Sequence, residues 1–467
     1  MKIQLVGASY QEWSSPFDHQ RTVNFYPVVD QKGGKEVSAL YGTPGLSLFT
    51  TVGTGSNRQC FNAANGRTFW VVGSQLIEVD AAGVGTVRGS LDQSSGRVII
   101  EENGFQLAIC DGFSLYILTY STNVFGKASI PAVLGFGTIS FIDGYFLGNE
   151  NSTGRFYISK ALDGLVWNAS EFATAESSPD NLIRVIRGIG QLWLMGVNTT
   201  EIWNNTGDSV FPFAAISGGQ FNTGILSPYT AIEIDSSLFW VGRDKNGVGT
   251  VYQTSGFSAQ RISTPPIEQK IIKAGDYANM TAFTYNNEGH KFYMITGGGL
   301  TTSLVYDLTI GEWHERAYKN VDGEFEQHLA VCHMYAFGKH LVGDRTNGNI
   351  YEMGRDFYDD NGNEILSERI YTNLTDENKR IPYNRLKLGF EAGIGLQTGQ
   401  GSDPVCWISL SKDGGRTWSN DYELKLGKVG QYSREAVLRR IGMAEQLTFR
   451  LRMSDPVKRA FTGSYLS

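Results

Sequence analysis

The chain has 467 residues, of which 41% are apolar and only 19% are charged, and its formal net charge is −7. A protein that binds nucleic acid tightly is usually basic, because contacts with phosphate supply most of the affinity. The negative net charge therefore argues against tight DNA binding. It still allows a protein past which DNA slides, since an acidic wall repels phosphate. The 56 glycines and the 12% of aromatic residues favour many short strands joined by tight turns.

Cysteine usage and hydrophobic runs indicate the compartment. The start of the chain, Met1–Trp13, lacks a charged stretch followed by an apolar run, so we predict no signal peptide. No segment approaches the roughly 18 apolar residues that a membrane span needs. We therefore expect a soluble product of a reducing cytoplasm, with no membrane anchor. Four widely separated cysteines without a CxxC pair are interpreted as buried thiols: Cys60, Cys110, Cys332 and Cys406.

Residues 1–50 show no clear period. Gln20–Val29 is expected to form one strand. Pro44 and Gly45 fit the central positions of a type II turn, in which glycine supplies a positive φ. We expect this N-terminal segment to pack on the C-terminal part of the chain.

From residue 51 onward, β-hairpins repeat. In the clearest one, Gln191–Met195 is a strand, Gly196–Asn198 turns the chain, and Thr199–Trp203 returns. Successive turns are about 45 residues apart, which is the period of a β-propeller blade. The turns fall near Gly73, Gly112, Asn149, Gly196, Gly242, Gly297 and Gly343.

The expected fold class is therefore all-β, with a propeller over residues 51–353. The spacing fits six or seven blades, and an array of β-sandwiches is the structural alternative. One short helix is predicted within Ser263–Tyr277. Thr264 would be its N-cap, and Pro265 its first residue, where a missing N–H costs nothing.

Beyond Met353 the composition changes. The acidic stretch Asp356–Glu364 is expected to be a boundary or an exposed loop. Between residues 447 and 453 apolar residues alternate with Thr448, Arg450 and Arg452, which predicts a half-buried strand. Ser433–Gly442 fits a helix or an exposed strand. We interpret residues 354–467 as a separate, sandwich-like β domain.

The sharpest local motif is SKDGGRTW, which matches the Asp-box pattern S-x-D-G-G-x-T-W. An Asp box is a structural turn, in which the aspartate accepts backbone N–H bonds, the glycines allow the bend and the tryptophan packs beneath. Sialidases, which are propeller enzymes, usually carry several such boxes, whereas this one lies outside the predicted propeller. The residues of the motif are Ser411, Asp413, Gly414, Gly415, Thr417 and Trp418.

For the other candidate sites, the sequence favours ordinary structural roles over catalysis or metal binding. Glu101-Glu102 and Asp359-Asp360 are expected to be solvated turns rather than catalytic pairs, because neighbours on a strand point to opposite faces. The six histidines are scattered, so no metal site or other cofactor is predicted. A basic C-terminal set on an acidic protein is either a contact with another subunit or partner, or an ordinary solvated face. Its members are Arg434, Arg439, Arg440, Arg450, Arg452, Lys458 and Arg459.

Seven stretches carry a resemblance to a known family. They are NFYPV (Asn24–Val28), YGTPGL (Tyr41–Leu46), Ser177–Asp208, IEQKII (Ile267–Ile272), VYDLTIGEWHE (Val305–Glu315), and SKDGGRTW with RRIGMAEQLTFRLRMSDPV. In this order they resemble the packaged-DNA stabilisation proteins of short-tailed bacteriophages, also called tail nozzle or tail hub proteins. The similarity is collinear over nearly the whole chain.

The resemblance implies a non-enzymatic virion protein, with a propeller for which the family suggests six blades. It implies a hexameric ring in the phage tail, below the portal and the tail adaptor, assembled in the host bacterial cytoplasm. The ring would close the channel after packaging, carry tail fibres or spikes, and release genomic DNA without sequence-specific contacts. The alternatives are an Asp-box glycan-processing enzyme of the sialidase type and a general propeller scaffold for protein interactions.

Overall fold

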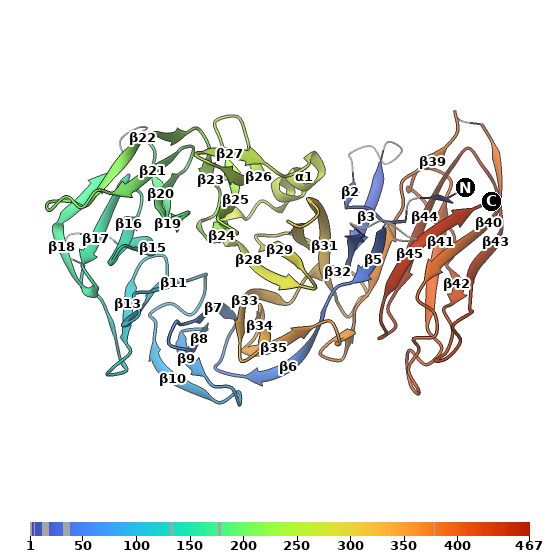
Figure 1. The fold of residues 1–467 in the computed structure, drawn as a ribbon, viewed down its shortest axis with the longest axis horizontal. Helices are drawn as coiled ribbons and strands as arrows, with labels where there is room; N and C mark the ends of the chain where they lie inside the picture. Colours follow the sequence, from blue (N-terminus) through green and yellow to red (C-terminus); the bar gives the residue numbers. More distant parts are fainter. Residues whose placement is uncertain are drawn as a thin grey trace.

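The computed structural model describes residues 2–3, 5–11, 18–30, 38–130, 133, 135–175, 179–377 and 379–467. Two β-rich bodies lie side by side, a ring of small sheets and a sandwich, with N-terminal strands between them (Figure 1). Both chain ends lie in the sandwich.

The ring consists of seven units of four strands or slightly more, numbered here as blades in chain order. Blades 1 to 3 are β7 (Asn57–Asn62), β8 (Thr68–Val72), β9 (Gln75–Val79), β10 (Gly85–Ser90); β11 (Ile99–Glu102), β12 (Gln106–Cys110), β13 (Leu115–Thr119), β14 (Val124–Lys127); and β15 (Phe136–Ile142), β16 (Tyr145–Glu150), β17 (Arg155–Lys160), β18 (Asp163–Thr174). Blades 4 and 5 are β19 (Leu182–Gly188), β20 (Gln191–Gly196), β21 (Thr200–Asn205), β22 (Phe213–Phe221); and β23 (Gly224–Ile225), β24 (Ile232–Ile234), β25 (Ser237–Arg243), β26 (Val248–Ser255), β27 (Ser258–Arg261). Blades 6 and 7 are β28 (Met280–Asn287), β29 (His290–Gly297), β30 (Ser303–Asp307), β31 (Glu312–Lys319), β32 (Phe325–Gln327); and β33 (Ala330–Ala336), β34 (Lys339–Asp344), β35 (Asn349–Gly354), β6 (Gly45–Thr51).

The ring closes, so the predicted propeller is confirmed, and the described strands give seven blades rather than six. Each blade contacts the next, mostly through their first strands, and β33 of blade 7 contacts β7 of blade 1. Blade 7 takes its outer strand, β6, from the N-terminal segment, where it pairs antiparallel with β35. The expected propeller range, 51–353, omits most of this strand, which holds the two ends of the ring together.

The middle strands of each blade explain why the hairpins are visible in the sequence. Every residue of β8 and of β12 is buried, because neighbouring blades cover both faces of these strands. The outer strand β10 is largely exposed and has no comparable apolar run. The predicted helix is also confirmed as α1 (Pro265–Ala274), which begins after Thr264 and packs against β26. Two short 3₁₀ helices complete the ring, η1 (Pro228–Thr230) and η2 (Tyr277–Asn279).

The second body is a sandwich of two sheets around a shared apolar core. One sheet has the order β4-β5-β45-β40-β43, with β1 on β45: β1 (Lys2–Ile3), β4 (Phe25–Val29), β5 (Ser38–Gly42), β40 (Ile381–Phe390), β43 (Ala436–Ala444), β45 (Ala460–Leu466). The other has the order β3-β38-β44-β41-β42, with β2 on β3 and β39 on β44: β2 (Tyr10–Gln11), β3 (His19–Val23), β38 (Ser367–Ile370), β39 (Leu374–Thr375), β41 (Val405–Ser411), β42 (Tyr422–Lys425), β44 (Gln446–Met453). The predicted β44 is confirmed, since Leu447, Phe449, Leu451 and Met453 are all fully buried.

Three local predictions are wrong or incomplete. Gln20–Val29 is not one strand, because Asn24, with φ 53°, separates β3 from β4. Gly45 has no positive φ; it begins β6, and its lack of a side chain admits the backbone carbonyls of Phe357 and Asp359. Within Asp356–Glu364, β36 (Asp359–Asp360) and β37 (Asn363–Glu364) form a hairpin, and Asp360 pairs with β6 and is only 2% exposed.

The open alternative at Ser433–Gly442 is resolved as strand β43. The four cysteines are buried free thiols, as predicted. No helix among the described residues has the length and apolar character required to cross a membrane.

Candidate functional site: the junction of propeller and sandwich

Strand β3 joins the two bodies. It pairs antiparallel with β38 of the sandwich and, through Val23 and Glu315, parallel with β31 of blade 6, so one continuous sheet runs from propeller to sandwich. At its end the positive φ of Asn24 directs the chain into the other sheet. The Asn24 amide donates hydrogen bonds to the carbonyl oxygens of Ala317 (2.9 Å) and Leu366 (2.8 Å), one on each body.

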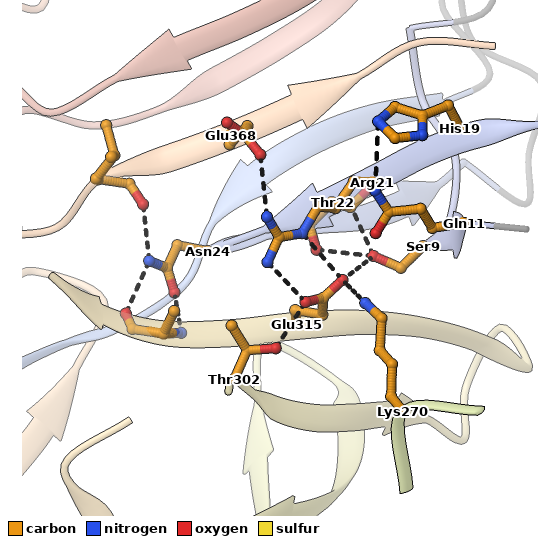
Figure 2. Close-up of polar contacts among 12 residues, drawn as sticks. Ser9, Gln11, His19, Arg21, Thr22, Asn24, Lys270, Thr302, Glu315 and Glu368 are labelled. Carbon is orange, nitrogen blue, oxygen red and sulfur yellow. Dashed lines mark hydrogen bonds and ion pairs between the residues drawn. The ribbon is translucent and has the colours of Figure 1, made fainter. Parts of the chain in front are cut away.

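A buried carboxylate, Glu315, lies at the centre of this junction (Figure 2). Its carboxylate accepts hydrogen bonds from the guanidinium of Arg21 in β3 at 3.1 Å and from the ammonium of Lys270 in α1 at 2.5 Å. Ser9 and Thr302 donate to it at 3.1 and 2.6 Å. Both carboxylate oxygens are therefore satisfied by groups from four separate segments.

The network continues into the sandwich through Arg21, whose Nη1 lies 3.5 Å from Glu368 of β38. Burial alone would raise the pKa of Glu315, but Arg21 and Lys270 lower it far below its usual range. Burial raises the pKa of Glu368, which has weaker compensation. Glu315 is thus the ionised centre on which cations from two other segments converge, and these ion pairs link the two bodies.

The junction predicts a specific pH dependence. Because the folded pKa of Glu315 lies below its unfolded value, its stabilisation is complete above about pH 5 and is lost as the pH falls toward the folded pKa. We expect the difference in unfolding free energy between wild type and Glu315→Gln to shrink below about pH 4.5, by at most about 1.4 kcal/mol per pH unit. Urea unfolding between about pH 3 and pH 7 measures this difference. A constant difference over the whole range would contradict the assignment.

Sequence reasoning missed this site. Glu315 stands in the stretch EWHERA, in which Glu312 is exposed and Glu315 is buried. Its charged partners lie far from it in sequence, Arg21 by 294 residues and Lys270 by 45, so no local spacing relates them. The only signal in the sequence was the inclusion of NFYPV and VYDLTIGEWHE among the collinear motifs.

The Asp box forms the predicted turn after β41, in the sandwich. Asp413 accepts the N–H groups of Arg416 and Thr417 at 3.0 Å each and the Thr417 hydroxyl at 2.6 Å. The Ser411 hydroxyl donates to Asp413 at 2.7 Å and accepts from the N–H of Gly415 at 2.8 Å. These bonds lower the pKa of Asp413 and commit its carboxylate to the turn.

The glycines and the tryptophan of the Asp box also have defined positions in the turn. Gly414 and Gly415 are buried with positive φ, which the bend requires. Trp418 is half-buried, and the guanidinium of Arg450 lies 4.6 Å above its ring.

The predicted arginine set is divided by the fold. Arg439 and Arg440 are exposed on β43, the terminal strand of its sheet, and Arg434 is exposed just before it. Arg450 and Arg452 lie half-buried on β44 in the other sheet, where Arg452 pairs with Asp421. Arg459 is no surface residue, because it is 3% exposed and donates to Ile365 and Ser367 at 2.9 Å each, while Lys458 pairs with Glu391 at 2.7 Å.

The carboxyl pairs are not solvated turns, which corrects the expectation from the sequence. Glu101 and Glu102 are half-buried in β11, and burial raises the pKa of Glu101 to about 7. Burial likewise raises the pKa of Asp360 to about 7. Within the described part of the chain, no three His, Cys, Asp or Glu side chains gather as a metal site.

Two family models match the chain in succession. A model described as bacteriophage P22 Gp10, beta-propeller, matches residues 1–358, and one described as bacteriophage P22 Gp10, beta-sandwich, matches residues 368–467. Their descriptions agree with the ring and the sandwich. No curated protein matches the sequence.

Solved structures give weaker similarities. Two are structures of the extracellular domain of BT4673 from B. thetaiotaomicron. The first, described as a hybrid two component system, has 10% sequence identity, covers 78% of this chain and 45% of that chain, and gives a TM-score of 0.44. The second, described as a one component system, has 12% sequence identity, covers 88% of this chain and 62% of that chain, and gives a TM-score of 0.47. The third is virginiamycin B lyase from Staphylococcus aureus, with 10% identity, 64% of this chain, 95% of that chain and a TM-score of 0.45. The chain covers less than two thirds of the first two, and all three TM-scores are too low to support a conclusion.

Proposed function

The chain belongs to the bacteriophage P22 Gp10 family and is thus a structural protein of a phage tail, and on this premise we propose that copies of it form a ring below the portal and adaptor. The ring closes the DNA channel after packaging, carries tail fibres or spikes, and opens for DNA ejection. Its partners are other copies of the chain, the adaptor, the fibre or spike, and genomic DNA passing without sequence-specific contacts. We propose no catalytic role.

The observation that carries this proposal is the combination of the two-part family match with the buried network around Glu315. A ring that resists the pressure of packaged DNA needs subunits whose two domains do not move against each other. The shared sheet through β3 and the ion pairs of Arg21 and Lys270 with Glu315 supply this rigidity. The net charge of −7 suits a channel through which DNA slides without sticking.

A cyclic ring needs a head-to-tail interface with two different patches on each subunit. The exposed edge of the sandwich at β43 is our candidate for one patch. Its strand edge faces outward with Arg439 and Arg440, and the nearby Met443 and Tyr432 are 50% and 78% exposed. We propose that it meets an acidic face of the next copy.

Charge reversal at this edge tests the interface. We expect Arg439→Glu to raise the apparent dissociation constant of ring formation at least about tenfold, because it opposes two negative surfaces, while the unfolding midpoint stays unchanged. Purified full-length protein, alone and with its adaptor, is examined by negative-stain electron microscopy and analytical ultracentrifugation.

Arg416→Glu is the matched control, since Arg416 is also exposed but lies on the Asp-box turn. It should assemble like wild type. Monomers of the wild-type chain even with the adaptor present would overturn the ring itself. Equal assembly of both variants would overturn the assignment of β43.

A further inference from the structure

A cavity of about 570 Å³ lies at the axis of the propeller, and the proposed tail role does not use it. Its lining comes from the innermost strands of five blades, β7, β11, β15, β19 and β24, and from residues that adjoin them. Contacts run from β7 to β11, β15 and β19 in succession, and from β24 through β28 and β33 back to β7, so these strands surround one centre. A neighbouring cavity of about 750 Å³ shares Phe61 with this axial cavity, so the axis has room for a molecule larger than a single ion.

The lining of the axial cavity carries more negative than positive charge. It includes three glutamates, Glu101, Glu102 and Glu233, and one arginine, Arg187. The Glu102 carboxylate is occupied, since each of its oxygens accepts a hydrogen bond of 2.7 Å from a neighbouring group of the protein. Glu233 is exposed to solvent. Glu101 is therefore the carboxylate that is both withdrawn from solvent and free to receive a ligand.

The Glu101 carboxylate lacks compensation within the protein. It is half-buried, and among the described residues it forms no hydrogen bond and no ion pair. Burial raises the pKa of Glu101 to about 7, Arg184 and Arg187 counteract this rise, and Glu102 adds to it. A carboxylate that is partly withdrawn from water without a partner is costly to ionise. A bound cation would supply the interaction that the protein does not.

The apolar part of the lining indicates which kind of cation fits. Phe61, Phe141 and Ile186 line the same cavity as Glu101. The face of an aromatic ring attracts an ammonium ion, and apolar side chains accommodate an alkyl stem. A divalent metal ion fits less well, because it prefers several oxygen ligands, and no three acidic, histidine or cysteine side chains of the described residues gather as a metal site.

We propose that the axial cavity binds the ammonium group of an aliphatic amine, with the charge on the Glu101 carboxylate and the alkyl stem against Phe61 and Phe141. A free amine and the lysine side chain of a partner protein share this chemistry. Arg187 competes for the same carboxylate, but its side chain is exposed and forms no ion pair with Glu101 among the described residues.

The test is a methyl NMR titration of the full-length protein, isotopically labelled at its isoleucine methyl groups, with n-butylamine at constant ionic strength. The Ile186 methyl, assigned with the Ile186→Val variant, reports on the axial cavity. We expect a saturating shift of this signal, with an affinity that rises about tenfold between about pH 6 and pH 8, because Glu101 ionises over this range while the amine stays protonated. An affinity that does not change with pH would overturn the proposal.

Three further titrations separate the ammonium group from other ligands. Neutral 1-butanol and Mg²⁺ should give no saturating shift of the Ile186 methyl, and a response to either that equals that of butylamine would contradict the assignment. The capped tripeptide Gly-Lys-Gly distinguishes the two sources of the group. If it binds more tightly than butylamine, the ligand is the lysine of a partner; if not, the ligand is a free amine.

Glu101→Gln should weaken butylamine binding at least about tenfold at about pH 8 and remove its pH dependence. This variant should fold, because the change removes a carboxylate that has no partner. Glu423→Gln, the same change at an exposed position of the sandwich, should bind like wild type. Arg187→Met should tighten binding about threefold, since it removes a competing cation. Equal affinity and pH dependence of the Glu101→Gln and Glu423→Gln variants would refute the site.

Discussion

Glu315→Gln is expected to lower the free energy of unfolding by about 3 kcal/mol or more, the largest effect that we predict for an isosteric change. Removing one member of a buried charge network leaves the others without compensation, which typically costs about 3–5 kcal/mol. Here Arg21 and Lys270 would both lose the carboxylate that accepts from them. Urea unfolding of the full chain, followed by tryptophan fluorescence, measures the loss.

The control is Glu312→Gln, at the exposed start of the same strand, which should change stability by less than about 0.5 kcal/mol. Adding Lys270→Gln to Glu315→Gln should recover part of the loss, since it removes one of the orphaned cations. Equal stabilities of the Glu312→Gln and Glu315→Gln variants would show that the junction does not depend on this network.

Gly45→Ala is expected to cost about 2–3 kcal/mol, although glycine to alanine in a strand usually stabilises or is neutral. A methyl group there would lie 2.5 Å from the carbonyl oxygen of Phe357 and still closer to that of Asp359. Both are backbone atoms that cannot move without disturbing β6, the strand that closes the ring through β35. Thermal unfolding of the Gly45→Ala variant should have its midpoint at a lower temperature than that of the wild type.

Gly126→Ala is the matched control. Gly126 is also an extended strand residue without positive φ, in β14, but a methyl group there would meet nothing within 4 Å. We expect Gly126→Ala to be neutral or slightly stabilising. If Gly45→Ala is as stable as Gly126→Ala, the closure of the ring does not require the close approach at residue 45.

The propeller was predictable because its middle strands carry a local signal. Each predicted turn, from Gly73 to Gly343, lies in or beside the hairpin formed by the two central strands of one blade. Both faces of such hairpins are covered, so they read as apolar runs between glycine and asparagine turns. One predicted turn thus falls in each of the seven blades.

The blade count stayed open because closure is not a local property. Outer strands such as β14 contain no buried residue and have no apolar run of their own. Blade 7 includes β6, which comes from a segment that precedes the repeat. The periodicity within residues 51–353 therefore does not reveal the pairing of β6 with β35. The same limit explains Gly45, whose role depends on the β36–β37 hairpin, which follows the whole propeller in the sequence.

The junction and the arginine set were beyond sequence reasoning for a related reason. Charge pattern shows which residues are cations, but not which sheet or partner receives them. Arg450 and Arg439 are near each other in sequence and lie on different sheets, while Arg21 and Glu315 are 294 residues apart and share hydrogen bonds.

The most direct test of the proposed tail role is a cryo-electron microscopy map of tails on intact, DNA-filled virions. We expect a closed ring of this chain directly below the adaptor, with the end of the packaged DNA held above it and the sandwich edge at β43 in contact with the next copy. A map in which the chain is a single copy away from the channel axis, or is missing from the tail, would contradict the proposal.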